Sequence, residues 1–200
     1  MSSLARQNSR ALWAWGRNLK GQLGDGTTTN YPSPVQVSNL TGVITIAAGA
    51  YHSLALKSNG TAWAWGFNGY GQLGDGTTTM RTAPVQVSSL AGATAIAGGN
   101  LHSLAVKSDG TAWAWGYNYY GQLGDGTTTS RAAPIEVSGL AGAAAVAGGW
   151  NHSLARQNNR VLWAWGYNGY GQLGDATTTE RTIAAPVTGL ISTNTITSTG

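Results

Sequence analysis

Cysteine is absent from the 200-residue chain, which excludes disulfide frameworks, thiolate metal sites and cysteine nucleophiles. Charged residues make up only 9%, and the lysines and arginines are scattered, so no basic stripe marks a nucleic-acid groove. Only two glutamates are present, Glu136 and Glu180, and no paired-carboxylate motif appears. No apolar run approaches the roughly 18 residues of a membrane span. We therefore expect neither a nucleic-acid nor a membrane partner.

What the chain does contain is an internal repeat, which decides the fold class when it is found. The tetrapeptide WAWG recurs with a period of 50 residues, and GQLGD follows it each time at a fixed distance. Met1 occupies the repeat position of Tyr51, and Gly200 occupies that of Ala50. The sequence thus predicts a single repeat domain over residues 1–200, made of four units in a permuted frame.

Each unit is expected to form four short strands. Apolar and alternating segments bounded by Gly-rich turns are typical of strands, and Asn59-Gly60 is typical of a tight hairpin turn. Helical periodicity is absent, and a four-stranded unit in tandem is typical of a β-propeller blade. In the unit 43–92, strands are expected at 43–49, 53–57, 61–66 and 83–87.

The tryptophans of the WAWG motifs are predicted to be structural. Residues two apart project to the same face of a strand, so each pair shares one face. Burying one tryptophan removes roughly 200 Å² from water, worth about 5 kcal/mol as an upper bound. A chain this rich in glycine and threonine needs such burial to offset its ordering cost. We expect the core between successive blades to contain Trp13, Trp15, Trp63, Trp65, Trp113, Trp115, Trp163 and Trp165.

The run AGGxxHSLAL, a turn, WAWGxNxxGQLGDGTTT and P(V/I)xV resembles the RCC1 repeat over essentially the whole chain. The resemblance implies a β-propeller of four-stranded blades, usually seven in a closed ring, and a protein-binding role. It also implies a bacterial protein that is secreted or on the cell surface, although the N-terminal MSSLARQNSR lacks the apolar stretch of a secretory signal. The sequence itself leaves the compartment unknown.

Ring closure is the open structural question, because four blades are fewer than the family's usual number. The C-terminal strand near residues 193–199, around Ile196, is expected to pair with N-terminal strands within 3–16. Pairing within one chain would close a four-blade ring, and pairing between two chains would give an eight-blade homodimer, which we favour. A fragment of a longer protein is the third alternative. An unpaired edge strand would be prone to aggregation.

Candidate chemistry is sparse. His52, His102 and His152 occupy one repeat position, but none has a second ligand three or four residues away, so no metal site is predicted. The aspartate of each GDGTTT loop, such as Asp75, is interpreted as capping its own turn. Ser53 follows His52, and neighbours on a strand face opposite ways. We expect no catalytic residue, no cofactor and no metal.

The positions at which the repeats differ are the candidate binding residues. They lie on two loops of the unit and are rich in tyrosine and tryptophan, which are enriched in interface hot spots. The candidate partner-binding residues are Tyr51, Leu101, Trp150, Asn151, Tyr70, Tyr119, Tyr120 and Tyr170.

These features predict a non-enzymatic protein–protein interaction scaffold that presents loop aromatics from one face of a propeller. One alternative is a purely structural, designed or consensus-like repeat protein that associates only with itself. The other is a carbohydrate-binding propeller, since a rim of tyrosine and tryptophan can stack on sugars.

Overall fold

The computed structural model of the chain describes residues 2–7, 11–190 and 194–197. These residues form fifteen β-strands and no helix, so no helix among them is able to span a membrane. The strands are β1 (Ser2–Arg6), β2 (Leu12–Gly16), β3 (Tyr31–Gln36), β4 (Val43–Ala48), β5 (His52–Lys57), β6 (Ala62–Gly66), β7 (Arg81–Gln86), β8 (Ala93–Gly98), β9 (His102–Lys107), β10 (Ala112–Gly116), β11 (Arg131–Glu136), β12 (Ala143–Gly148), β13 (His152–Gln157), β14 (Leu162–Gly166) and β15 (Arg181–Pro186).

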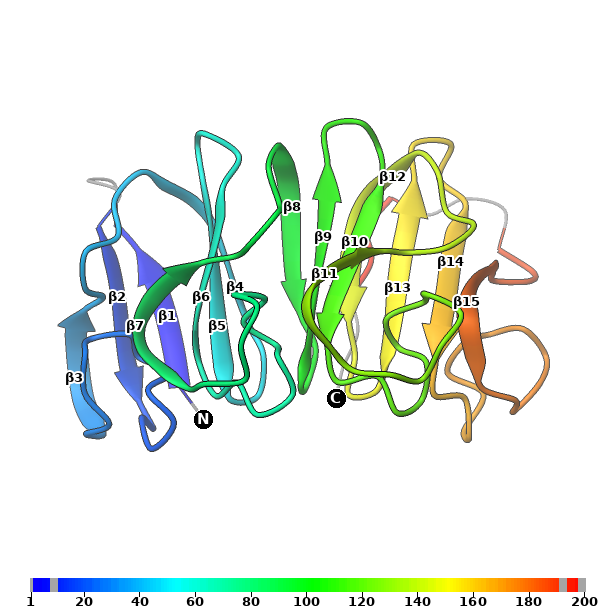
Figure 1. Ribbon diagram of the computed structural model, residues 1–200. Coiled ribbons are helices and arrows are strands. Elements are labelled where there is room, and N and C mark those ends of the chain that lie inside the picture. Colours follow the sequence, from blue (N-terminus) through cyan, green and yellow to red (C-terminus); the bar gives the residue numbers. More distant parts are fainter. Residues whose placement is uncertain (1, 8–10, 191–193, 198–200) are drawn as a thin grey trace.

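The strands group into four antiparallel sheets, which we call blades 1 to 4 in chain order (Figure 1). Blades 2, 3 and 4 each contain four strands in sequential order, β4 to β7, β8 to β11 and β12 to β15. Blade 1 contains only β1, β2 and β3, and β1 is the counterpart of the second strand of the other blades. The prediction of an all-β protein with four-stranded propeller blades is confirmed, with blade 1 one strand short among the described residues.

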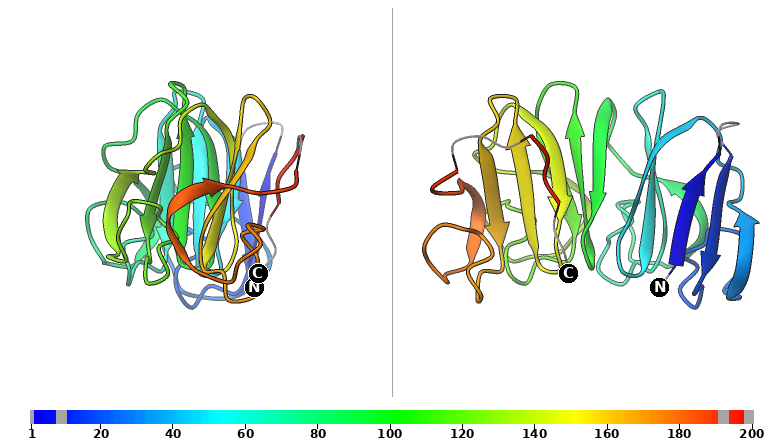
Figure 2. Two further views of the ribbon diagram at one scale, coloured as in Figure 1. Left: turned by 90° about the vertical axis from the view of Figure 1, so that its right-hand side faces the viewer. Right: turned by 180° about the vertical axis from the view of Figure 1, so that it is seen from behind.

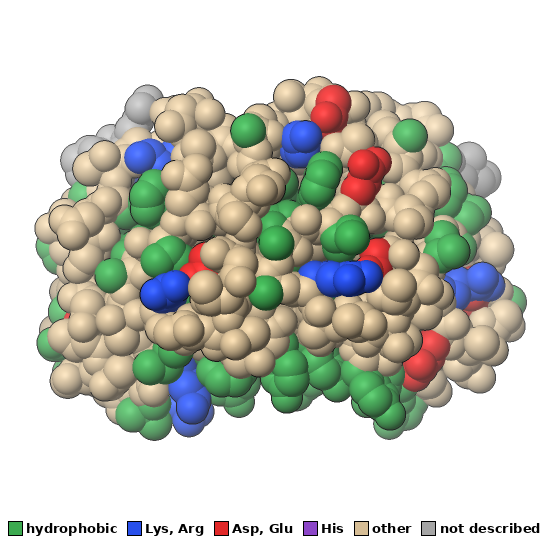
Figure 3. All heavy atoms as spheres, in the orientation of Figure 1, with side chains coloured by type: hydrophobic (Ala, Val, Ile, Leu, Met, Phe, Trp, Pro, Cys, Tyr) green, Lys and Arg blue, Asp and Glu red, His purple; other side chains and the backbone are tan. Residues whose placement is uncertain are grey.

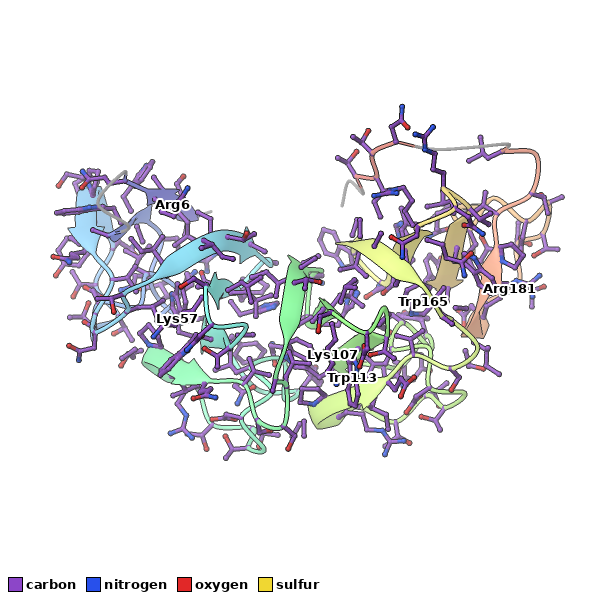
Figure 4. All side chains as sticks on the ribbon, turned by 90° about the horizontal axis from the view of Figure 1, so that it is seen from above. Arg6, Lys57, Lys107, Trp113, Trp165 and Arg181 are labelled. Atoms are coloured by element: carbon purple, nitrogen blue, oxygen red, sulfur yellow. The ribbon has the colours of Figure 1, made fainter. Side chains whose placement is uncertain are left out.

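The blades stand side by side in an arc (Figures 2 and 4). Seen from above, the arc is open on one side, with blade 1 at one end and blade 4 at the other (Figure 4). Residues 194–197 belong to no strand, and most of them are exposed. The predicted pairing of 193–199 with 3–16 falls partly outside the described residues and stays a prediction.

The core consists of three apolar clusters, one at each blade-to-blade contact. Trp65, Trp115 and Trp165 each lie in one of these clusters and are 0% exposed. Each indole Nε1 donates a hydrogen bond to a backbone carbonyl of the preceding blade, at 2.8–3.0 Å. The three acceptors are the carbonyl oxygens of Gln22, Gln72 and Gln122.

The first tryptophan of each motif has a different environment. Trp63 and Trp113 are partly buried, and a lysine ammonium lies over each ring, Lys57 at 5.4 Å and Lys107 at 5.0 Å (Figure 4). Trp163 is also partly buried and contacts the cluster between blades 3 and 4. In blade 1 both Trp13 and Trp15 are partly buried. The second indole of the motif is therefore the principal one in the contact between blades.

Glycine is required where each buried indole meets the preceding blade. Gly74 has a φ of +69°, and a Cβ added to it would lie 2.7 Å from Trp115 Nε1. Real Cβ atoms do not approach this closely, so the glycine of GQLGD is explained by sterics as well as by backbone conformation.

A line of buried histidines and serines also joins the blades. His52 Nε2 lies 2.9 Å from Ser103 Oγ, and His102 Nε2 lies 3.0 Å from Ser153 Oγ. Ser103 Oγ donates its only hydrogen to the carbonyl of Gln72. It must therefore accept from His52, which selects the imidazole tautomer protonated at Nε2.

We expect Trp115→Ala to lower the free energy of unfolding by roughly 3–5 kcal/mol, because it leaves a cavity between blades 2 and 3. Trp113→Ala is the matched control. Its ring is partly exposed, so the loss should be clearly smaller. Denaturant unfolding followed by circular dichroism measures both, and equal losses would contradict the assignment of the second indole as the main contact.

Stability should fall between pH 6.5 and pH 4. Burial lowers the pKa of His52 to about 4, and burial followed by the charges of neighbouring histidines lowers the pKa of His102 to about 3. Unfolded histidine has a pKa near 6.5, so in this window the unfolded chain binds protons that the folded chain does not. The stabilisation is complete above about pH 6.5 and decreases on acidification, by on the order of 3 kcal/mol per histidine at pH 4.

The test is to measure the free energy of unfolding across this window for the unmodified chain and for His102→Gln. The variant should show a shallower pH dependence, because one titrating group is gone. A curve for the unmodified chain that is flat from pH 7 to pH 4.5 would refute the prediction.

Candidate functional site

The long loop that follows each WAWG motif is held rigid by its own side chains. Buried Asn68 donates from Nδ2 to Asp75 Oδ1 and to the carbonyls of Thr77 and Thr79, and its Oδ1 accepts from the Leu73 amide. The Asp75 carboxylate accepts from the Thr77 amide at 3.0 Å, which caps its own turn as predicted. Blades 3 and 4 repeat the arrangement around Asn118 and Asn168. Such a loop holds its surface side chains at fixed positions.

An arginine completes each of these loops in blades 2 to 4. Arg81 pairs with Asp75 at 2.8 Å, and Arg131 pairs with Asp125 at 2.8 Å. Burial would raise the pKa of Asp75, but hydrogen bonds from Thr77 and Arg81 outweigh burial and hold the pKa below its usual range. The arginine that follows GDGTTT thus has a structural role in the loop.

Eight aromatic side chains on these loops and the adjacent turns form a continuous surface, which we call the aromatic ribbon. Each ring lies within 4.8–6.4 Å of the next, measured between centroids. Figure 3 shows hydrophobic side chains gathered along the lower rim of the molecule, where these loops lie. The ribbon consists of Tyr51, Phe67, Tyr70, Tyr117, Tyr119, Tyr120, Tyr167 and Tyr170.

The ribbon crosses from blade to blade by one repeated contact. Tyr70 of blade 2 meets Tyr117 of blade 3 at 4.8 Å and 60°, and Tyr120 of blade 3 meets Tyr167 of blade 4 at 4.9 Å and 61°. At the joint between blades 1 and 2 the tyrosine is replaced by Lys20, whose ammonium lies 5.5 Å from the centre of the Phe67 ring. The ribbon therefore ends in a cation towards blade 1.

The ribbon consists of uncharged side chains, of which Tyr70, Tyr119 and Tyr170 are exposed and the others are partly buried. Tyr119 is 66% exposed and Tyr170 is 89% exposed, while Tyr120 is partly buried beneath its neighbours. Burial and then the neighbouring phenols raise the pKa of Tyr117 above its usual value, so this hydroxyl stays protonated near neutral pH. The surface offers ring faces and neutral hydroxyl groups, with the ammonium of Lys20 at its blade 1 end.

A second feature adjoins the ribbon on the turns before β5, β9 and β13. Trp150 is 59% exposed, and with Tyr51, Asn100 and Arg17 it lines a cavity of about 470 Å³. The turns are linked across blades, since the Asn100 amide donates to the carbonyl of Gly149 at 3.2 Å. Tyr51 belongs to both features and makes them contiguous.

Of the predicted binding residues, the structure brings six onto this surface: Tyr51, Tyr70, Tyr119, Tyr120 and Tyr170 lie in the ribbon, and Trp150 lines the cavity. Leu101 and Asn151 are partly buried, and their carbonyls accept from the amides of ribbon residues Tyr117 and Tyr167. These two residues therefore hold ribbon residues in place through their backbone and contribute little exposed surface.

Sequence reasoning missed three members of the ribbon, Phe67, Tyr117 and Tyr167. Each directly follows a WAWG motif, three residues before a predicted binding tyrosine. An aromatic residue three positions before a tyrosine, repeated after the last three WAWG motifs, was the available signal. Their position inside the motif made them resemble fixed framework residues rather than a variable surface.

The histidines offer no catalytic or metal-binding arrangement. Since His52 donates to Ser103 and the serine donates to a carbonyl, the hydrogen bonds run opposite to those that activate a serine nucleophile. Within residues 2–7, 11–190 and 194–197, no group of three or more His, Asp or Glu side chains is placed to hold a metal ion.

Comparison with known proteins agrees with the fold. A segment of 46 residues is 44% identical to human protein RCC2 and covers 22% of this chain but 9% of RCC2. The crystal structure of human WBSCR16 has a TM-score of 0.89 at 24% identity, covering 99% of this chain and 53% of WBSCR16. Prp20p of Saccharomyces cerevisiae has a TM-score of 0.83 at 22% identity, covering 94% of this chain and 48% of Prp20p.

The chain thus spans about half the length of these two structural neighbours. At identities below 25% they establish the fold alone. The family is established separately, because the sequence model of the RCC1-like domain family matches residues 1–200. With its four Trp-linked blades and its repeated WAWG and GQLGD motifs, the chain belongs to the RCC1-like domain family.

Proposed function

We propose that this chain is a non-enzymatic protein-binding scaffold whose contact surface is the aromatic ribbon. The observation that carries the proposal is the continuity of eight rings across three blades on rigid loops. Large exposed aromatic patches on soluble domains are characteristic of interaction sites. Rigid loops also lower the entropy cost of binding, because the side chains are already in place.

The chemistry of the ribbon specifies the kind of partner. Ring faces and neutral hydroxyls favour an extended peptide segment that carries apolar or proline side chains and accepts hydrogen bonds through its backbone. Lys20 and Arg17 at the blade 1 end favour an acidic residue at the corresponding end of that segment. A solved structure of the neighbour Prp20 is described as a complex with Kap60, so protein binding has a precedent on this fold.

The two other functions predicted from the sequence rest on weaker observations. Sugar binding would use the same rings, but carbohydrate sites add polar side chains that fix the hydroxyl groups, and the exposed ribbon residues are themselves only tyrosines. A purely structural role would leave the exposure of Tyr119 unexplained, since this side chain stays exposed although its blade has a neighbour on both sides.

The proposal is tested by selecting a displayed random-peptide library against the immobilised chain and measuring the affinity of enriched peptides by calorimetry. We expect Tyr119→Ala combined with Tyr70→Ala to weaken binding by about 30-fold, the size of a hot-spot loss near 2 kcal/mol. Both side chains are exposed, so folding should be unaffected.

The matched control is Ile183→Ala. Ile183 is 50% exposed on β15 and lies outside the ribbon, so peptide affinity should not change. Enriched peptides that bind the tyrosine variant as tightly as the unmodified chain would rule out the ribbon as the contact surface. A glycan array probed in parallel distinguishes the sugar-binding alternative.

A further inference from the structure

The outer face of blade 4 carries an apolar surface that is buried in every other blade. Leu40, Leu90 and Leu140 occupy one repeat position and are only 3–5% exposed, because each is covered by the blade that follows. Leu190 occupies the same position in blade 4 and is 54% exposed. The valines three residues earlier in the first three blades are 1–2% exposed, whereas Val187 is only partly buried.

The outer face of blade 1 carries the complementary half of that contact. The serine of each later blade is fully buried and donates at 2.8 Å to a carbonyl of the preceding blade, as Ser53 does to Gln22. Ser3 occupies this position and is exposed. Trp15 is the counterpart of Trp65, Trp115 and Trp165, and it is partly rather than fully buried.

The glycines of blade 4 retain space for these partners. In blade 3, a Cβ at Gly124 would lie 2.8 Å from Trp165 Nε1, and one at Gly121 would lie 2.7 Å from the Thr182 Cα. A Cβ added at the equivalent Gly174 would have only the Val187 side chain nearby, at 2.9 Å. A Cβ added at Gly171 would have no atom nearer than 3.9 Å. The backbone of blade 4 thus has the shape that receives an indole.

The same complementarity extends to the lower rim. At each contact between blades, a residue of one loop meets the residue directly after the WAWG motif of the next blade. The three pairs are Lys20 with Phe67, Tyr70 with Tyr117, and Tyr120 with Tyr167. The blade 4 counterpart of Tyr70 is Tyr170, which is 89% exposed. The blade 1 counterpart of Tyr117 is Arg17. A phenol and a guanidinium form the same kind of cation–π pair as Lys20 and Phe67, with the roles of the two sides exchanged.

The C-terminal segment matches the strand that blade 1 lacks. Within complete blades the first strand pairs with the second so that Ile46 lies opposite Ala55 and Ile96 lies opposite Ala105. Ile196 occupies the same repeat position and retains a β-branched apolar side chain. The repeat register places Ile196 opposite Ala5 of β1.

From these five correspondences we infer that a second copy of this chain packs against both ends of the arc, closing a ring of eight blades with two identical joints. Trp15 of each copy packs beneath Gln172 and Gly174 of the other, and residues 194–197 of each copy, with Ile196 opposite Ala5, pair with β1 of the other. The inference shares Tyr170 and Arg17 with the surface proposed for peptide binding, and its tests measure association of the chain with itself rather than peptide binding.

The first experiment measures the mass of the chain at about 10 µM by sedimentation and by light scattering after size exclusion. We expect twice 20.6 kDa, that is 41.2 kDa. A mass of 20.6 kDa would overturn the inference, and so would a mass that keeps rising with concentration, which would indicate open head-to-tail polymers.

Paired variants then test whether the joint is the one described. Leu190→Asp places a charge in the joint and should weaken association by at least about 100-fold, whereas Leu19→Asp should leave the dimer intact. Leu19 is a close control, since it is 53% exposed and its counterparts, including Tyr119, remain exposed with a blade on both sides. Circular dichroism checks that both variants fold.

A mixing experiment separates this joint from any symmetric contact. Ser3→Asp and Leu190→Asp damage opposite halves of the joint, so each variant alone should be monomeric. In an equimolar mixture one joint contains two unmodified halves, and heterodimers of 41.2 kDa should reappear at higher concentration. Variants that each remain dimeric alone, or a mixture that stays monomeric at all concentrations, would overturn the inference.

Discussion

The structure depends on one contact, the insertion of an indole from each blade beneath the GQLGD turn of the blade before it. The ring is buried in an apolar cluster, and its only polar atom donates to a backbone carbonyl, so the indole nitrogen is satisfied. The second glycine of GQLGD lies against the ring, and a Cβ at this position would collide with the indole. The indole is the largest buried side chain in each cluster and packs there with leucine and valine side chains, so this contact helps to set the spacing between blades.

The binding surface is a consequence of the same contact. The loops that carry the tyrosines continue from the turns that cover the indoles, and internal amide and carboxylate hydrogen bonds hold them rigid. When the indoles fix the distance between blades, position 70 of one blade meets position 117 of the next at 4.8 Å, and position 120 meets position 167 at 4.9 Å. Stability and presentation of the ribbon therefore depend on the same geometry, although the ribbon residues themselves lie outside the core.

An arc built from one repeated contact has two complementary ends. Three such contacts form among the described residues, whereas at the two ends of the arc Leu190 is exposed and Trp15 is only partly buried. The ends of the arc therefore differ from its interior in that side chains such as Leu190 are exposed to solvent, whereas their counterparts in the other blades are buried. That difference is invisible in the sequence, where the positions look equivalent.

The sequence by itself determined the strands, the four-unit organisation and the family resemblance, because these follow from local alternation, turn residues and exact periodicity. The variable positions of the repeat were a partial guide to exposure, since Tyr70, Tyr119 and Tyr170 are exposed but Tyr51 and Tyr120 are partly buried. Only the tertiary structure decided that the second tryptophan of the motif is fully buried in blades 2 to 4 while the first is partly buried, and that Phe67, Tyr117 and Tyr167 complete the ribbon. These properties depend on contacts between residues about 50 positions apart, which the distance and angle between neighbouring blades create and which no local pattern encodes.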